Sequence, residues 1–150
     1  FGIVGLITGC LGAIISILSY HHNKIDALNN YFTYDRDIDF IKGRNIANNL
    51  KEKIAEDENY YISLVVNTYH HWGLLVKHHQ LPFWVFYDKK YGITASGIAI
   101  IKNYKKLEHL ISERRKDNRE YACYFSWLYK KVYNNCNNEE KGYIDNLIKQ

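Results

Sequence analysis

Histidine is the residue type with the clearest chemical potential in this chain, because six of the seven histidines occur as adjacent pairs. The pairs are His21-His22, His70-His71 and His78-His79. On one unbroken helix His71 and His78 would share a face, and with a carboxylate nearby they could hold a metal ion. Gly73 and the Leu81-Pro82 pair argue against a continuous helix there. We therefore favour histidines that make ordinary hydrogen bonds at the surface or at helix ends.

Two groups of acidic residues could also do chemistry. Asp35, Asp37 and Asp39 alternate, so on a strand they would share a face able to bind Mg²⁺ or Ca²⁺. On a helix or turn they would spread, and capping is the favoured role. His109 and Glu113 are four residues apart and could form an acid–base pair, but a helix-surface pair is the simpler interpretation. The chain also lacks the P-loop, G-x-S-x-G, G-x-G-x-x-G and H-E-x-x-H motifs, so we expect no catalytic residue, no metal and no cofactor.

The segment from 102 to 131 is the strongest candidate for binding an anion. It holds nine Lys or Arg residues against four Asp or Glu, in a chain of net charge +4. Arg114, Arg115, Lys116 and Arg119 are predicted to lie around one turn between two helices, where they could contact phosphate groups. The alternative is a solvated, basic helix end that binds nothing.

The elements that position these residues begin with an apolar stretch, Phe1 to Tyr20. It contains no charged residue and no Pro, and as a helix it would reach about 30 Å, the thickness of a bilayer's hydrocarbon core. It is longer than the apolar region of a secretory signal, and no small-residue cleavage site follows it. The stretch therefore predicts a transmembrane helix.

Small residues in this stretch lie at regular intervals of three and four. They are Gly2, Gly5, Gly9, Gly12, Ser16 and Ser19. This spacing draws one stripe along a helix, and Gly5 with Gly9 forms a G-x-x-x-G pair. Because small residues let two helix backbones approach closely in lipid, the stripe predicts a homo-oligomer that associates through the membrane helix.

The rest of the chain has helical periodicity. Apolar residues predict helices over about 25–32, 40–55, 60–76, 82–90, 98–116, 121–133 and 143–148. We expect Asp57 to cap the central helix 60–76, for which a strand over 62–66 is the rival because β-branched residues cluster there. We expect Gly92 to end the helix 82–90 in the left-handed conformation.

The predicted architecture is all-α. It consists of a transmembrane helix over 1–20, a juxtamembrane helix or linker over 21–34, and one helical domain of about five to six helices over 35–150. Three widely spaced cysteines, Cys10, Cys123 and Cys136, indicate reduced thiols rather than a disulfide framework. The thiols favour a cytoplasmic domain.

The stretch from about 64 to 132 resembles an uncharacterised bacterial family of membrane-anchored helical domains, one of the groups known only as domains of unknown function. The residues that carry the resemblance are Gly73 to Lys77, Leu81 to Tyr87, Tyr104 to Leu107, Ile111, Arg114, Arg115, Tyr121, Ala122 and Tyr124 to Leu128. The resemblance implies an all-helical domain behind a single membrane span. It implies no reaction.

These features predict a membrane-anchored, self-associating, non-enzymatic effector or regulator. We expect it in the bacterial inner membrane, with the lipid bilayer, further copies of the chain and a protein as its partners. By analogy with small bacterial modules, it could be a membrane-perturbing component of antiphage defence. The alternative is a membrane-tethered module that binds nucleic acid or a nucleotide through the basic segment 102–131.

Overall fold

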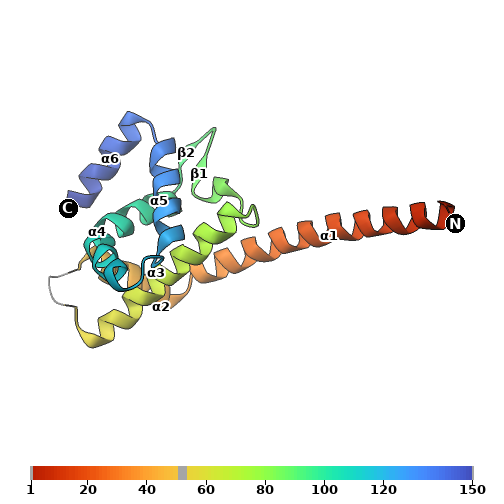
Figure 1. The fold of residues 1–150 in the computed structure, drawn as a ribbon. Coiled ribbons are helices and arrows are strands. Elements are labelled where there is room, and N and C mark those ends of the chain that lie inside the picture. The colour runs from red at the N-terminus through yellow and green to blue at the C-terminus, as the bar shows by residue number, and fades with distance from the viewer. Residues whose placement is uncertain (1, 51–53, 150) are drawn as a thin grey trace.

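The computed structural model describes residues 2–50 and 54–149, with side chains from Gly12 onward. These residues form six α-helices, a short 3-10 helix and one two-stranded hairpin (Figure 1). The elements are α1 (Gly2–Asp35), α2 (Ile38–Asn48), α3 (Glu56–Lys77), η1 (Phe83–Val85), β1 (Tyr87–Asp88), β2 (Gly92–Ile93), α4 (Ala95–Asp117), α5 (Cys123–Asn135) and α6 (Asn138–Lys149). The predicted all-helical class is confirmed.

The long helix α1 has two unlike halves. Its N-terminal part projects from the other helices as an isolated arm (Figure 1), and every residue from Gly12 to Asn23 is exposed. Its C-terminal part packs on the domain, where Ala27 and Tyr31 are buried. The predicted helix over 25–32 is therefore the last part of one helix that begins far outside the domain.

Among the described residues, no helix is both long enough and apolar enough to cross a membrane. The transmembrane helix predicted for 1–20 is thus not supported. Phe1 lies outside the described residues, as do the side chains of residues 2–11, which make up half of that stretch.

The central helix α3 is buried along one side. Ile62, Val65, Tyr69, Trp72 and Val76 are almost completely buried and follow intervals of three and four. That interval is the period of a helix, and it places the five side chains on the face that packs against α2 and α5. The rival strand prediction is wrong because the buried side chains require this helical period.

Two glycines allow close contact between helices. A Cβ atom on Gly73 would lie 2.2 Å from the carbonyl oxygen of Tyr124 in α5, and one on Gly43 would lie 2.7 Å from that of Tyr61 in α3. No side chain larger than hydrogen fits at either place without moving backbone. Gly73 therefore does not interrupt α3, which continues to Lys77.

The segment predicted as a helix over 82–90 is instead a 3-10 turn followed by a hairpin. β1 and β2 are antiparallel, with Tyr87 opposite Ile93. The Asp88 side chain accepts hydrogen bonds from the backbone N–H groups of Lys90 (2.8 Å) and Tyr91 (3.0 Å), which stabilises the tight turn. Gly92 is left-handed as predicted, with φ of +83°, but it closes this hairpin and ends no helix.

Two helix ends also differ from prediction. α2 ends at Asn48, short of the predicted 55. α3 starts after Ala55, whose backbone N–H donates to Glu58 (3.0 Å), so Asp57 lies inside the first turn and does not cap it. Acidic residues in the first turn still favour the helix, because they complement its positive end.

Candidate functional site

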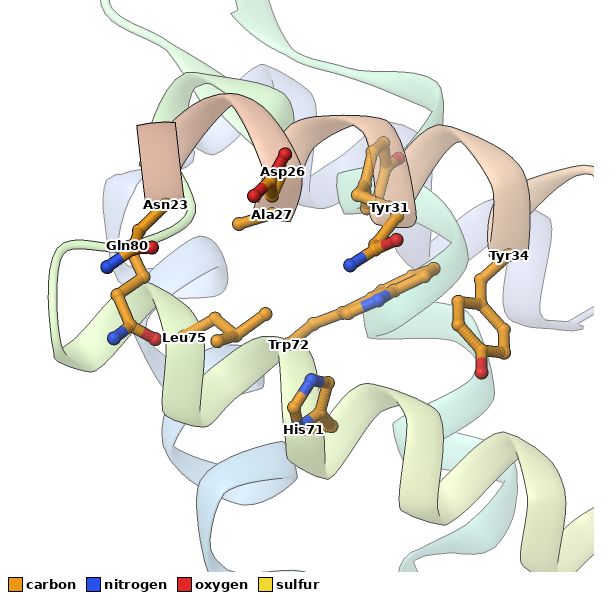
Figure 2. A pocket seen from close by; sticks show the side chains of 10 residues that line it. Asn23, Asp26, Ala27, Tyr31, Tyr34, His71, Trp72, Leu75 and Gln80 are labelled. Atoms are coloured by element: carbon orange, nitrogen blue, oxygen red, sulfur yellow. The ribbon is translucent and has the colours of Figure 1, made fainter. Parts of the chain in front are cut away.

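A cleft lies between α1 and the C-terminal half of α3, where the arm joins the domain (Figure 2). Its volume is about 570 Å³, within the usual range of small-molecule sites. Its lining is Asn23, Asp26, Ala27, Asn30, Tyr31 and Tyr34 from α1, His71, Trp72 and Leu75 from α3, and Gln80 from the following turn.

Helical spacing explains how these residues come together. Four of the lining residues of α1, Asn23, Asp26, Asn30 and Tyr34, follow intervals of three, four and four, so they share one face. His71 and Leu75 are four apart on α3 and face them across the cleft (Figure 2). Asn23 and Gln80 lie together at one end of the cleft, and Tyr34 lies at the other. The cleft thus runs along the seam between the two helices.

Tyr31 and Trp72 form the buried floor of the cleft. Their ring centroids are 4.6 Å apart, and the Tyr31 ring also meets Phe86 edge-on at 5.7 Å. The Tyr31 hydroxyl forms a hydrogen bond with the hydroxyl of Ser96 at the start of α4. Burial raises the pKa of Tyr31 to about 12, opposed in part by that bond. The phenol therefore stays protonated at neutral pH and acts as a hydrogen-bonding group, not as a base.

The rim of the cleft is polar and carries one carboxylate. Asp26 lies 3.3 Å from the Nε2 atom of His22, one turn earlier on α1. None of the described residues that line the cleft is a Lys or Arg. Three carboxamides, an imidazole and a carboxylate suit a neutral or cationic polar group, and they disfavour a phosphate.

A smaller hollow adjoins the cleft on the other side of His71 and Trp72. It has a volume of about 250 Å³ and is lined by Tyr34, Leu64, Asn67, Thr68, His71 and Trp72. Beside these hollows, α1 is held to the domain by the buried Ala27 and Tyr31 and by the ion pair between Asp35 and Arg44.

The three histidine pairs lie along the two helices of this cleft. His71 lines it, whereas His70 faces away and packs edge-on against Tyr124 at 5.1 Å. Desolvation by burial, with a smaller contribution from the neighbouring His71, lowers the pKa of His70. His78 ends α3 and His79 follows with φ of +59°. Within the described residues no group of three metal-ligating side chains comes together.

The predicted acidic candidates have structural roles. The Asp37 side chain caps α2 by accepting from the Phe40 N–H at 3.0 Å, and Asp35 pairs with Arg44 at 3.0 Å. Asp39 is exposed in the first turn of α2. The alternating carboxylates therefore lie between the end of α1 and the first turn of α2, and not on a strand.

The His109–Glu113 pair is likewise on a helix surface. Glu113 pairs with Lys116 at 2.8 Å, and that hydrogen bond is the main reason why the pKa of Glu113 is lowered. His109 is exposed and makes a smaller contribution in the same direction. This geometry is that of a surface pair.

The arginines of the predicted anion site hold the domain together. Arg114 donates to Tyr121 Oη (2.6 Å) and Ser63 Oγ (3.3 Å), and its other amino group bonds Asn59. It thereby joins the start of α3 to the end of α4. Anion binding by this guanidinium stays a prediction, and it would have to compete with these bonds.

Arg115 stabilises the turn that follows. Its Nε donates to the Tyr121 carbonyl (2.8 Å), and its Nη2 donates to the Ala122 carbonyl (3.2 Å) and Ser126 Oγ (2.6 Å). Ala122 has φ of +54°, so these bonds satisfy carbonyls at a strained turn. Lys116 pairs with Glu113, and Arg119 is exposed.

The oligomerisation stripe is described only in part. Gly12, Ser16 and Ser19 are exposed, and a Cβ atom on Gly12 would meet nothing within 4 Å. The Ser16 hydroxyl donates to the Gly12 carbonyl at 2.9 Å within the helix. Gly2, Gly5 and Gly9 lie in the helix, but they fall outside the residues whose surroundings are described.

Sequence reasoning missed the cleft. It followed the apolar residues of 25–32 and did not follow the polar residues between them. The signal was present, because Asn23, Asp26, Asn30 and Tyr34 repeat at helical intervals just after an uncharged stretch.

Comparisons with protein-family models, curated proteins and solved structures find no match to this chain. The resemblance to a family of membrane-anchored helical domains therefore stays a prediction.

Proposed function

We propose that the chain is a membrane-anchored, self-associating, non-enzymatic effector or regulator. One observation carries the proposal: a single helix continues from an exposed, uncharged arm into the floor of a ligand-sized cleft. On this proposal the arm enters the bilayer, and the helical domain remains on the cytoplasmic side and receives a ligand or protein partner.

The exposed arm supports the first part of the proposal. Ile14, Ile15, Ile17 and Leu18 are each 53–62% exposed, and they follow one another with no charge between them. A contiguous apolar surface of this kind is unusual on a protein that stays in water. Among the described residues no helix is both long and apolar enough to cross a bilayer, so the proposed span rests on the sequence of 1–20, which as a helix would reach about 30 Å.

A pair of double variants tests the anchor. Ile14→Asp with Ile17→Asp places two charges in the arm, each opposed by about 3 kcal/mol at the centre of a span. Ile38→Asp with Ile41→Asp adds the same charge at exposed residues of the domain. We expect the wild type and the domain variant to resist carbonate extraction and the arm variant to be released. If carbonate also extracts the wild type, the proposed membrane anchor is wrong.

The stripe supports the second part. Gly43, Gly73 and Gly97 are required by close contacts inside the domain, whereas Gly12 has open space beside it. Its surface remains free for a second helix. Self-association through small residues is the usual way in which helices pack in lipid.

Two glycines provide a matched test of self-association. Gly12 and Gly142 both lie in helices with open space around the missing Cβ. Replacing either with Leu gains a similar helix propensity of about 0.8 kcal/mol. Crosslinking in detergent should detect fewer oligomers of Gly12→Leu, while Gly142→Leu should match the wild type. Unchanged oligomers in both would exclude the stripe as the interface.

A role in antiphage defence is a narrower form of the same proposal. If the associated arms perturb the bilayer, expression should release a trapped dye from cells or vesicles, and Gly12→Leu should reduce that release. If the protein is anchored in the membrane but releases no dye, the arm acts as a tether and does not perturb the bilayer.

The alternative function, nucleic-acid or nucleotide binding by 102–131, is favoured by a basic and aromatic surface. Lys131 lies 4.9 Å from the ring centroid of Trp127, and Lys105 lies 5.8 Å from that of Tyr129. Cations interleaved with aromatic rings suit single-stranded nucleic acid. Binding that falls steeply with salt and with Lys105→Gln and Lys131→Gln would favour this alternative.

A further inference from the structure

The two chain segments that flank the base of the arm are almost free of acidic residues. Asp26 is the sole acid between Phe1 and Tyr34, and none occurs between Asn59 and Tyr87, although the chain has 16 in total. The same segments hold Lys24, Lys77 and six of the seven histidines. Their surface is therefore neutral to positive, and it becomes more positive as histidines protonate.

In the structure these two segments lie next to each other near Asn23 of α1. Gln80, just beyond α3, and Asn23 of α1 line the same end of the cleft (Figure 2). The turn after α3 lies on the side of the domain from which the arm leaves (Figure 1). Residues 20–24 of α1 and residues 77–80 thus lie at the base of the arm, and we call them together the collar.

The collar has the chemistry of a membrane interface. Tyr20 is 45% exposed at the end of the apolar stretch, and the Lys24 ammonium lies 4.3 Å from its ring centroid. An amphipathic aromatic ring with a lysine one turn further is typical of a helix that leaves the hydrocarbon layer. His78 and His79 are exposed on the facing turn. Lys77, the last residue of α3, is also exposed, and its ammonium lies 5.1 Å from the ring centroid of Tyr124 in α5.

We propose that this collar binds the phosphate groups of anionic lipids. The inference rests on the proposed membrane anchor, because the arm places the collar at headgroup depth. Within these two segments of the sequence Asp26 is the only acidic residue, and it lies beside His22. The continuity of collar and arm favours a lipid surface over a nucleic acid.

The test uses the full chain in bilayers that contain phosphatidylcholine and phosphatidylglycerol. Spin-labelled lipids report the relative association constant of the two headgroups by electron paramagnetic resonance. A lysine at an anionic surface contributes about fivefold to binding. Lys24→Gln with Lys77→Gln should therefore lower the preference for phosphatidylglycerol by up to about 25-fold, to near unity.

Lys130→Gln with Lys149→Gln removes the same charge from exposed residues of α5 and α6 and should keep the preference. No preference in the wild type, or an equal loss in both variants, would overturn the proposal. So would displacement of the lipid by inorganic phosphate or by an RNA oligonucleotide. If the chain fails to enter the bilayer at all, carbonate extraction detects that separately, and the anchor proposal fails instead.

Discussion

Tyr31 is a main packing contact between α1 and the rest of the domain, so its truncation should allow α1 to detach from the domain. The side chain is 3% exposed and packs against Trp72 and Phe86. Removing a buried aromatic ring costs about 3–5 kcal/mol, and losing the hydroxyl bond to Ser96 accounts for about 1 kcal/mol of such a change. We expect Tyr31→Ala to lower the free energy of unfolding by about 4 kcal/mol and Tyr31→Phe by about 1 kcal/mol.

The neighbouring residue supplies the control. Phe32 is on the same helix turn but 44% exposed, so Phe32→Ala should cost less than about 1 kcal/mol. Urea denaturation measures the three differences. Amide exchange should separate a local effect from a global one. If α1 detaches first, the protection of residues 27–34 should fall by about 1,000-fold, as about 4 kcal/mol implies, while that of α3 and α5 is kept.

The outcome that would refute this reasoning is equally specific. If Tyr31→Ala lowers the free energy of unfolding no more than Phe32→Ala does, the Tyr31 ring is not what holds α1 on the domain. If amide protection falls equally in α1, α3 and α5, α1 is an inseparable part of the core, and a ligand in the cleft could not move it independently.

Three further changes have expected outcomes. Gly73→Ala forces α3 and α5 apart and should cost about 2 kcal/mol in urea denaturation, whereas Gly142→Ala, with open space beside it, should stabilise by about 0.8 kcal/mol. The pKa of Tyr31 is raised to about 12 by burial, so the unfolded chain loses this proton first as pH rises above 10. Stability should then fall with rising pH, and less steeply in Tyr31→Phe. Cys136 is buried and burial raises its pKa to about 11, so peptide mass analysis should find Cys123 alkylated first.

Most of the helical architecture could be predicted from apolar periodicity. Where intervals of three and four persist, as in α3, α4 and α5, the predicted and observed helices agree. The hairpin could not be predicted in this way, because Phe83 to Tyr87 form an aromatic run that suits a helix equally well. What decides against the helix is the Asp88 side chain, which accepts two backbone N–H groups and closes a turn with Gly92.

The functional residues were less predictable because their partners are distant in sequence. From the sequence, Arg114 and Arg115 are cations of a basic segment with no evident partner. In the structure their guanidinium groups donate hydrogen bonds to Asn59, Ser63 and Ser126. A linear pattern gives the charge of a residue but not the hydrogen bonds that tertiary contacts provide. The cleft was missed for the same reason, since four of its ten lining residues come from α3 and the turn after it, some 40 or more residues later in the sequence.

The small-residue stripe and the cleft belong to one face of α1. After Ser16 and Ser19 the same intervals of four and three continue to Asn23, Asp26 and Asn30, which line the cleft. A straight helix drifts by about 20° per heptad from such a repeat, so Ser16 and Asn30 differ by about 40° in direction. A second arm packed on the stripe and α3 packed at the cleft therefore approach α1 from nearly the same side. Consider two copies of α1 that run parallel and touch at Ser19. Either the two helices separate before they reach Asn30, or the second helix lies against the mouth of the cleft. If the arms associate as proposed, the geometry of this one helix would couple their association to occupancy of the cleft, which is the relation that a regulator needs between its two ends.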